Sequence, residues 1–378
     1  MKHNLLQVVL DLQFVGEKVV VALAKEVSDE YNIFFCCLDR VGLLGEDLQK
    51  EGFFVESLGR RPGRDWTLPS KIGKLAKDLK IDIIHAHHYT PYFYSALSRF
   101  IHRHPRLLFT EHGRNLPDVV NIDRKLANLI LNLVTDRITA VCQDSKSALQ
   151  GKDWLPSSKI SVIYNGIDPV EQRIESVDED TRKVLDWLGP TDNAVGFLAR
   201  LDPIKDPILL IESFRITLEK IPEAKLIVMG KGPLHEELVQ RCLSYGISKN
   251  VMFSGLLKNP MPVLPRLRAL VMTSISEAAS LSILEAMMCG IPVIAKKVGG
   301  NPELVTDQKT GFLIADSSAP SFAEAMAKLL RDKSLSEKMG QAAKKEANSR
   351  FSFKVMVEQY KSIYQSLLNS NPRSVQKV

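Results

Sequence analysis

The sequence has few of the features that mark secreted or membrane-spanning proteins. Its 378 residues include only five cysteines, an odd number without paired spacing. Reduced thiols in a cytosolic protein explain that usage more simply than a disulfide framework. No uninterrupted apolar run is long enough to span a bilayer. An apolar stretch near the N-terminus is broken by Asp11, Glu17 and Lys18, and no small-residue cleavage site follows, so we expect no signal peptide.

The chain also lacks a large excess of charge of one sign. The formal net charge is +6 and is spread along the chain rather than massed in a tail. This argues against nucleic acid as a partner but permits peripheral contact with an anionic membrane. Basic and aromatic residues mix at 60–64 and 92–106, where the simplest interpretation is a solvated loop and a packed helix, with membrane contact as the alternative. We expect a cytoplasmic protein, with contact at the inner face of the membrane as an open alternative.

A complete set of metal ligands is missing as well. Several histidines crowd residues 85–112, and His85 and His87 share one face of a predicted strand end. Paired histidines of this kind occur in metal sites, so a metal centre is one interpretation. No cysteine or carboxylate spacing completes the ligand set, and ordinary hydrogen-bonded histidines are favoured.

Short apolar runs alternate with helical runs along the whole chain. Strands rich in β-branched residues, without polar alternation, indicate sheets buried on both faces. The length predicts two domains. The predicted strands are 6–12, 33–38, 54–58, 82–86, 107–111, 138–142, 160–164, 195–199, 226–229, 251–253, 270–273, 292–295 and 311–314. The fold class is therefore α/β, with two doubly wound Rossmann-like domains facing a cleft.

A turn at 165–169 marks the predicted boundary between the domains. An acidic, weakly periodic segment follows it as far as Asp180. We predict a first domain over 1–165, a second domain over 166–350, and a terminal helical segment over 351–378.

Residues 271–314 form the predicted core of the functional site. They alternate strand, helix and strand, and ligands of parallel sheets bind where loops leave the carboxyl ends of strands. One such loop carries Glu277, with Glu285 in the following helix, and the next loop contains Gly299-Gly300-Asn301. Carboxylates accept hydrogen bonds from sugar hydroxyls, and bare backbone amides donate to phosphate. This rim suits a polyhydroxylated, phosphorylated ligand.

Two cations precede that stretch. Arg200 closes an apolar strand, and Lys205 lies just before a helix that Asp206 can cap with Pro207 at its first position. Cations at a strand's carboxyl end, beside a helix N-terminus, suit a diphosphate. The alternative is a solvated loop with two surface cations.

Each of the other candidates also has a structural interpretation. Ser282 and Glu285 fit a capping box, and Asn301 can cap a helix that has Pro302 at its first position. Gly232 completes half of a dinucleotide fingerprint, which is weak evidence for a nicotinamide site. His112 ends a strand at the predicted ligand edge of the first domain, where a hydrogen-bonded loop histidine is the competing interpretation.

Taken together, these residues resemble a family 4 retaining glycosyltransferase with the GT-B fold. The resemblance covers nearly the whole chain, and the order and spacing of the C-terminal motifs are specific. The motifs are TEHGR at 110–114, YNGID at 164–168, ARLDPIK at 199–205, SE at 276–277, LEAM at 284–287, GIPV at 290–293, VGGNPELV at 298–305 and TGFL at 310–313.

The resemblance implies transfer of a hexose or N-acetylhexosamine from a nucleotide-sugar donor, with UDP favoured by family frequency. The implied acceptor is a hydroxyl of a glycan or lipid-linked molecule in cell-surface polysaccharide synthesis. The last helix would cross back onto the first domain. The implied catalytic residues are His112, Arg200, Lys205 and Glu277. The implied donor-binding residues are Gly16, Arg200, Lys205, Gly232, Glu277, Ser280, Leu281, Glu285, Gly299, Gly300 and Asn301.

No cofactor and no metal are expected. A departing diphosphate gains negative charge that either a metal ion or fixed cations must stabilise. The one acidic triplet, 178–180, falls in the predicted interdomain segment, so Arg200 and Lys205 are the better candidates.

The chain departs from the family pattern at two places. Ala278-Ala279-Ser280 replaces Gly-Phe-Gly-like residues, and Val15-Gly16-Glu17 is a reduced form of an N-terminal Gly-Gly. The alternatives left open are a nucleotide-sugar epimerase of the same fold, a non-catalytic nucleotide-sugar-binding protein and, more distantly, a nicotinamide oxidoreductase.

Overall fold

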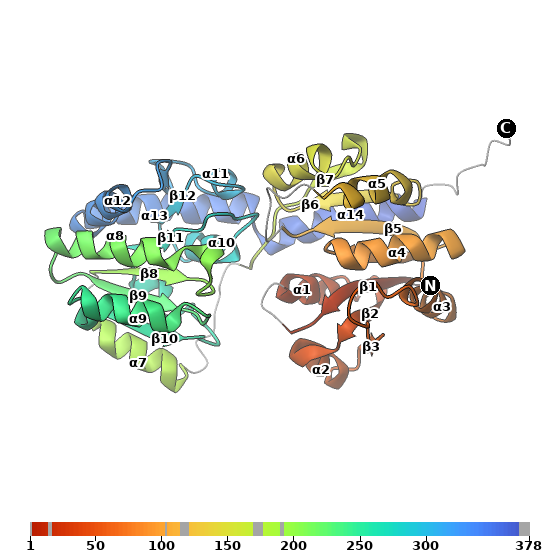
Figure 1. Cartoon of the computed structure of the whole chain (residues 1–378), viewed down its shortest axis with the longest axis horizontal. Coiled ribbons are helices and arrows are strands. Elements are labelled where there is room, and N and C mark those ends of the chain that lie inside the picture. The colour runs from red at the N-terminus through yellow and green to blue at the C-terminus, as the bar shows by residue number, and fades with distance from the viewer. Residues whose placement is uncertain are drawn as a thin grey trace. The chain divides into compact units, whose positions relative to one another are not determined.

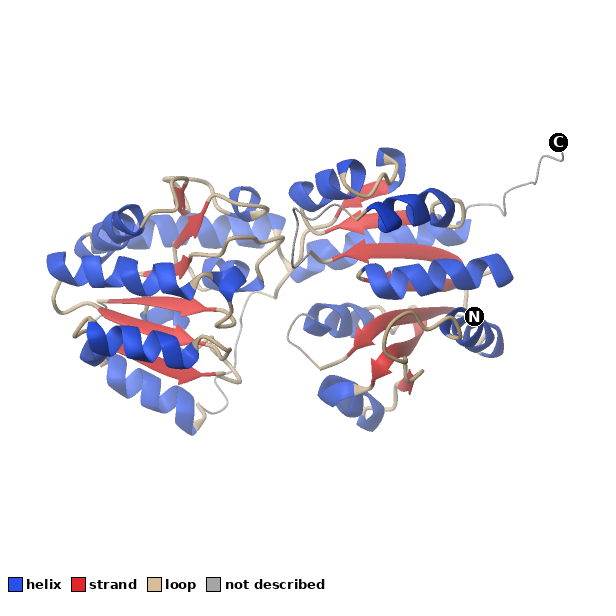
Figure 2. Cartoon of the chain, in the orientation of Figure 1, coloured by secondary structure: helices blue, strands red, loops and turns tan. Residues whose placement is uncertain are grey.

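The computed structural model describes residues 2–13, 17–102, 104–113, 121–168, 177–189 and 193–369. The chain forms two compact units, one comprising Met1–Gly166 with Lys354–Val378 and the other Ile167–Phe353. Each unit is a parallel sheet with helices on both of its faces (Figures 1 and 2). The predicted α/β fold with two doubly wound sheets is confirmed.

The sheet of the first unit has the strand order β3-β2-β1-β4-β5-β6-β7, and all its described pairings are parallel. Its strands are β1 (His3–Asp11), β2 (Tyr31–Arg40), β3 (Phe54–Ser57), β4 (Ile83–His87), β5 (Arg106–Glu111), β6 (Arg137–Ala140) and β7 (Ile160–Val162). Its helices are α1 (Lys18–Glu26), α2 (Gly42–Lys50), α3 (Leu68–Asp78), α4 (Tyr89–Ile101), α5 (Ile122–Leu131), α6 (Gln143–Gly151), η2 (Ser157–Lys159) and α14 (Phe353–Asn369).

Burial on both faces explains the continuous apolar strands of this unit. Every residue of β4 is buried, including His85 and His87. The terminal helix α14 covers polar groups of these strands, since the Tyr364 hydroxyl lies 2.8 Å from His85 Nδ1. An ion pair of 2.6 Å between Lys361 and Glu30 also holds α14 to the first unit.

The sheet of the second unit has the order β10-β9-β8-β11-β12-β13, again with parallel pairings throughout the described strands. Its strands are β8 (Ala194–Leu198), β9 (Lys225–Met229), β10 (Val251–Gly255), β11 (Ala269–Met272), β12 (Val293–Lys296) and β13 (Gly311–Ile314). Its helices are α7 (Glu179–Leu188), η3 (Pro203–Lys205), α8 (Pro207–Lys220), α9 (His235–Ser244), η4 (Ser248–Asn250), η5 (Leu264–Arg266), α10 (Leu281–Met288), α11 (Asn301–Leu304), α12 (Ala319–Arg331) and α13 (Lys333–Arg350).

Both sheets reverse their strand order at one place. The switch lies between β1 and β4 in the first unit and between β8 and β11 in the second. Ligands of such sheets bind outside the carboxyl ends of the strands at the switch point. The loops after β8 and β11 carry Arg200, Lys205 and Glu277. The topology therefore brings the predicted cations and carboxylate to one edge.

The acidic triplet at 178–180 is a correction to the sequence analysis. It does not belong to an irregular linker, because Asp178 is the N-cap of α7 and its Oδ1 accepts the Thr181 amide at 2.8 Å. Glu179 and Asp180 occupy the first turn, where the helix dipole favours negative charge. Among the described residues, no helix combines the length and apolarity needed to cross a bilayer.

Candidate active site

Lys205 and Glu277 meet at the switch point of the second unit. Lys205 Nζ lies 2.7 Å from Glu277 Oε1, and their side chains are 21% and 7% exposed. The same oxygen accepts a hydrogen bond of 2.7 Å from the Ser274 hydroxyl. Within the described part of the chain, no further partner holds Oε2 of Glu277. Both residues were predicted from the sequence as site residues, but their ion pair was not.

The loops after β8 and β11 are also joined through their backbones. The Thr273 hydroxyl donates to the carbonyl oxygens of Lys205 and Asp206 at 3.0 and 2.8 Å, and the Ile275 amide donates to the Ile204 carbonyl at 2.8 Å. Asp206 caps α8 as predicted, accepting the Leu209 amide at 3.3 Å from a left-handed backbone conformation. These bonds hold the backbone of Lys205 in place beyond the carboxyl end of the sheet.

Gly299 and Gly300 dock directly against the Glu277 loop. The Gly300 amide donates to the Glu277 carbonyl at 3.0 Å. Gly299 has a φ of +50°, and a Cβ there would lie 1.9 Å from the same carbonyl oxygen. Only glycine allows this approach, because any side chain would collide with backbone that cannot move aside. The glycine loop thus serves first to hold Glu277 in place.

Gly232 likewise allows close backbone contact, in this case with Leu201 in the loop that carries Arg200 and Lys205. A Cβ there would lie 2.3 Å from the Leu201 carbonyl oxygen, and the Leu201 amide bonds the Lys231 carbonyl at 3.0 Å. This contact explains the Gly-Lys-Gly spacing without a nicotinamide site. Arg200 projects outward, 70% exposed, with Nη2 2.6 Å from Asp202 Oδ2.

The remaining donor candidates lie around α10 and α11. Ser280, the N-cap position of α10, is buried, while Leu281 and Glu285 in the helix are half-buried. The predicted capping box is wrong, because α10 begins at Leu281 and Ser282 lies inside it. Gly16 lies outside the described residues, as does Arg114 of the first-domain motif.

The predicted cap by Asn301 is also wrong. Gly300 holds the N-cap position of α11, so Asn301 is the first helical residue and Pro302 the second. The fully buried Asn301 side chain instead donates to the Lys296 carbonyl at 3.0 Å. That bond ties the glycine loop back to the end of β12.

His112, itself half-buried, ends a chain of hydrogen bonds that runs into the core of the first unit. Its Nε2 lies 2.9 Å from His87 Nδ1, and His87 Nε2 lies 2.7 Å from Gln7 Oε1. Because Gln7 Oε1 only accepts, His87 donates from Nε2 and, when neutral, accepts at Nδ1 from His112 Nε2–H. The second nitrogen of His112, Nδ1, is then an acceptor.

Burial keeps these rings uncharged. Desolvation, reinforced by the neighbouring histidines, holds the pKa values of His87 and His112 well below the ordinary value. His85 has a depressed pKa for the same main reason, and its two nitrogens bond the hydroxyls of Tyr364 and Thr110 at 2.8 and 2.6 Å. Hydroxyl partners thus account for both nitrogens of His85, and the described residues include no histidine, cysteine and carboxylate cluster fit for a metal ion.

Comparison with known proteins identifies the family to which this chain belongs. Residues 16–171 match the family model "Glycosyltransferase Family 4", and residues 181–346 match "Glycosyl transferases group 1". The chain belongs to family 4 of the glycosyltransferases. This confirms the resemblance, and it makes the chain an enzyme of glycosyl transfer.

Curated relatives of this family 4 glycosyltransferase align over most of their length. The N-acetyl-alpha-D-glucosaminyl L-malate synthase of Bacillus anthracis is 27% identical over 83% of this chain and 82% of its own. The UDP-Gal:alpha-D-GlcNAc-diphosphoundecaprenol alpha-1,3-galactosyltransferase of Escherichia coli is 26% identical over 89% of each. The crystal structure of Anabaena HepE in complex with UDP shares the fold, with a TM-score of 0.83 and 24% identity over 97% of this chain and 100% of that one.

Proposed function

We propose that this family 4 glycosyltransferase moves a hexose or N-acetylhexosamine from a UDP-sugar to a hydroxyl of a lipid-linked glycan. The reaction would serve cell-surface polysaccharide synthesis at the inner face of the membrane, with retention at the anomeric carbon and without a metal ion. The observation that carries the proposal is the shielded Lys205–Glu277 pair at the switch point. The relatives support the reactants, since one is named for UDP-Gal and a diphosphoundecaprenol-linked acceptor, and HepE was crystallised with UDP.

Lys205 and Arg200 would hold the diphosphate of the donor. The charge that develops on the diphosphate as the glycosidic bond breaks needs a preorganised positive partner. Lys205 is preorganised because Glu277 and the backbone bonds of the η3 turn restrain it. Arg200 is exposed and, within the described residues, pairs with nearby Asp202, so it can turn toward a phosphate when the donor arrives.

Glu277 would orient the sugar. Its Oε1 already accepts from Lys205 and Ser274, which aims the carboxylate and leaves Oε2 for a sugar hydroxyl. Gly299 would add its backbone amide beside it, while the Gly300 amide, already bonded to the Glu277 carbonyl, would hold the loop in place. Glu285 on α10 would accept from the ribose. Ala278, where the family often has a glycine, leaves the donor sugar to be found by experiment.

The transfer step needs no protein nucleophile. The bond between the anomeric carbon and the diphosphate oxygen breaks, and the acceptor hydroxyl oxygen bonds to that carbon on the same face. The hydroxyl proton passes to the departing phosphate oxygen, so charge and atoms balance. His112, neutral in its network, would hydrogen-bond a sugar hydroxyl near this carbon without adding charge.

A donor screen tests the proposal directly. UDP and UDP-sugars should raise the melting temperature more than other nucleoside diphosphates, because a ligand that binds only the folded state stabilises it. Transfer to N-acetylglucosaminyl diphosphates with an attached lipid should survive chelation by EDTA. Release of a rearranged free sugar without acceptor would identify an epimerase. Binding without hydrolysis or transfer of any donor would identify a non-catalytic binder, and activity restored only by manganese would refute metal independence.

A further inference from the structure

A groove runs along the first unit between α4, α5 and the segment 60–66. Its cavity volume is about 460 Å³, within the ordinary range for ligand sites. Tyr89, Phe93 and Leu97 follow one another along α4 on one wall, while Ala127 and Ile130 of α5 line the other. Because α4 and α5 both begin at the carboxyl edge of the sheet, the groove starts at the edge that carries His112 and leads away from it.

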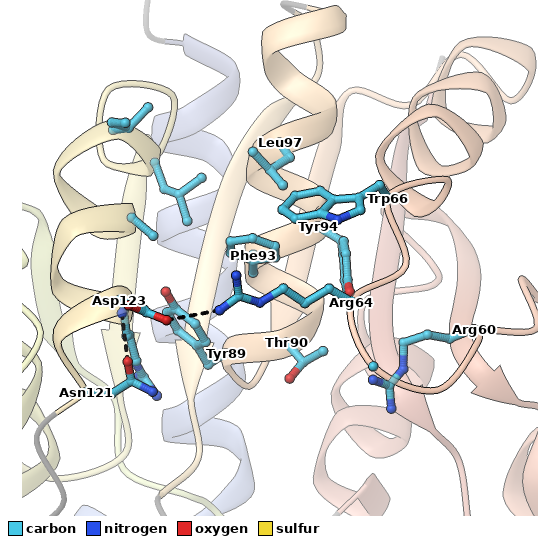
Figure 3. Close-up of a pocket in the computed structure, with 15 residues that line it drawn as sticks. Arg60, Arg64, Trp66, Tyr89, Thr90, Phe93, Tyr94, Leu97, Asn121 and Asp123 are labelled. Carbon is cyan, nitrogen blue, oxygen red and sulfur yellow. Dashed lines mark hydrogen bonds and ion pairs between the residues drawn. The ribbon is translucent and has the colours of Figure 1, made fainter.

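The groove changes character along its length. Figure 3 shows Arg64, Asn121, Asp123 and Tyr89 gathered toward one end, whereas Leu97 and Trp66 lie at the other. Arg64 pairs with Asp123 at 3.1 Å, but both are largely exposed, so the pair is weak and readily exchanged. The molecule best matched to such a groove has a charged head and an apolar chain.

The outer face of α5 extends the apolar end. Four of its large side chains recur at helical spacing on one stripe, which Leu133 continues in the turn after the helix, and all five are 52% to 69% exposed: Ile122, Leu126, Leu129, Ile130 and Leu133. Solvent-facing helix positions in a globular domain are normally polar, so an apolar stripe that faces solvent is unusual and marks a binding surface. Ile130 belongs both to the stripe and to the groove, which makes the two surfaces continuous.

We propose that this groove binds the apolar chain of the lipid-linked acceptor, with the acceptor's phosphate at its Arg64 end. The inference rests on the proposed function, because it names where that acceptor sits. The phosphate would displace Asp123 from Arg64, an exposed cation that lines the groove. The chain would lie along Phe93 and Leu97 and leave past Ile130 toward the stripe on α5.

Acceptor chain length tests the groove through kinetics. N-acetylglucosaminyl diphosphates with methyl, octyl or farnesyl chains would be compared below their micellar concentrations. For the wild type, KM should fall by up to about fourfold for each methylene that leaves water. Ala127→Trp fills the groove and should abolish this dependence, so that the three acceptors have similar KM values in this variant. Ser147→Trp, which adds the same residue to α6 outside both the groove and the stripe, should keep the wild-type dependence.

A binding measurement separates the groove from catalysis. In a chain whose Trp154 and Trp187 are replaced by Phe, a brominated long-chain alkyl phosphate should quench Trp66 in the groove. Ala127→Trp would add a second fluorescent tryptophan, so Leu97→Ser is the variant used to disrupt the groove in this measurement. It should raise the alkyl phosphate concentration needed for half-maximal quenching at least tenfold, roughly the effect of losing contact with two methylenes. This readout needs no turnover, and it also reports on the groove if Ala127→Trp fails to fold.

The outcomes discriminate between occupants. Chain-length dependence that persists unchanged in Ala127→Trp, or absence of Trp66 quenching, would overturn the proposal. Dependence seen only on vesicles, and lost in a Leu126→Ser, Leu129→Ser and Leu133→Ser variant, would assign the surface to the bilayer instead. Quenching without sugar transfer to any acceptor would refute the proposed function and leave the groove standing.

Discussion

In the second unit, the loops at the switch point meet through an ion pair, and glycine lets backbone contact backbone. In the first unit, the corresponding strand β4 and its neighbours meet through uncharged rings, with Gln7, His87 and His112 in a single chain of hydrogen bonds. The two sheets have the same switch-point topology, with one reversal of strand order in each. Topology therefore places the ligand edges, while the residues that end the strands decide what charge each edge presents.

The contrast matches the division of labour that the proposed function requires. A diphosphate that leaves with extra negative charge needs fixed cations, and Lys205 is restrained by Glu277 on the second unit. A sugar hydroxyl near the anomeric carbon needs hydrogen bonding without a charge that would compete with those cations. The depressed pKa values of His87 and His112 supply that neutrality on the first unit.

The largest expected effect comes from removing the restrained cation. Lys205→Ala should lower kcat by about 100-fold to 1,000-fold, as loss of one preorganised charge partner does in other enzymes. Lys249, an exposed cation of η4 at the opposite edge of the same sheet, provides the control, and Lys249→Ala should leave steady-state kinetics unchanged. A near wild-type kcat for Lys205→Ala would contradict this comparison between the units, because catalysis would then not depend on a fixed cation in the second unit.

Disrupting the contact between Gly299 and the Glu277 loop should give the next largest effect. A second glycine at positive φ separates the cost of that contact from the cost of backbone strain. Gly299→Ala and Gly246→Ala both place alanine at positive φ, +50° and +69°, but only the first meets backbone, at 1.9 Å. We expect Gly299→Ala to cost roughly 3 kcal/mol of unfolding free energy and Gly246→Ala about 1 kcal/mol. Urea unfolding of both variants checks this. Equal losses would mean that the Glu277 loop moves aside and that the contact is not rigid.

Much of both edges could be predicted from the sequence, because strand ends and turn residues are local signals. Apolar runs predicted the strands of both sheets, and the residues directly after them included Arg200, Lys205, Glu277 and His112. Helices α6, α7 and α9 were not predicted, since their residues are polar on average and contain few apolar side chains to mark a helix. Capping failed at Ser282 and Asn301, because a shift of one or two residues in a helix start changes which side chain is the cap.

Partners that are distant in sequence could not be predicted. Gln7 precedes His87 by 80 positions, and nothing in either local sequence shows that β1 and β4 pair in register Gln7–His85. Lys205 and Glu277 are likewise 72 positions apart. The groove between α4 and α5 could not be predicted either, because it depends on how two helices pack.

Acid should destabilise the first unit more than the second. His85 and His87 are buried and have depressed pKa values in the fold, so below about pH 6.5 the unfolded chain binds more protons than the folded one. Stability is therefore full above that pH and falls as pH decreases, by up to about 1.4 kcal/mol per pH unit for each buried ring. The second unit contains one histidine, His235. Hydrogen exchange resolved by segment between pH 7 and pH 5 measures this, and equal loss of protection in both units would contradict it.

The smallest effect sharpens the comparison by adding charge to the hydrogen-bond chain of Gln7, His87 and His112, whose members are uncharged. Gln7→Glu places a carboxylate beside His87 Nε2, where Gln7 Oε1 now lies at 2.7 Å. An adjacent carboxylate raises the pKa of a histidine, by about one unit or more at this distance. Once protonated, His87 donates from Nδ1 and can no longer accept from His112 Nε2–H, so His112 must change tautomer. The acidic limb of the kcat profile should then move to higher pH, whereas Gln7→Met, which adds no charge, should lower kcat without moving that limb. If all three profiles coincide, the hydrogen-bond chain is a packing feature and does not set the state of His112.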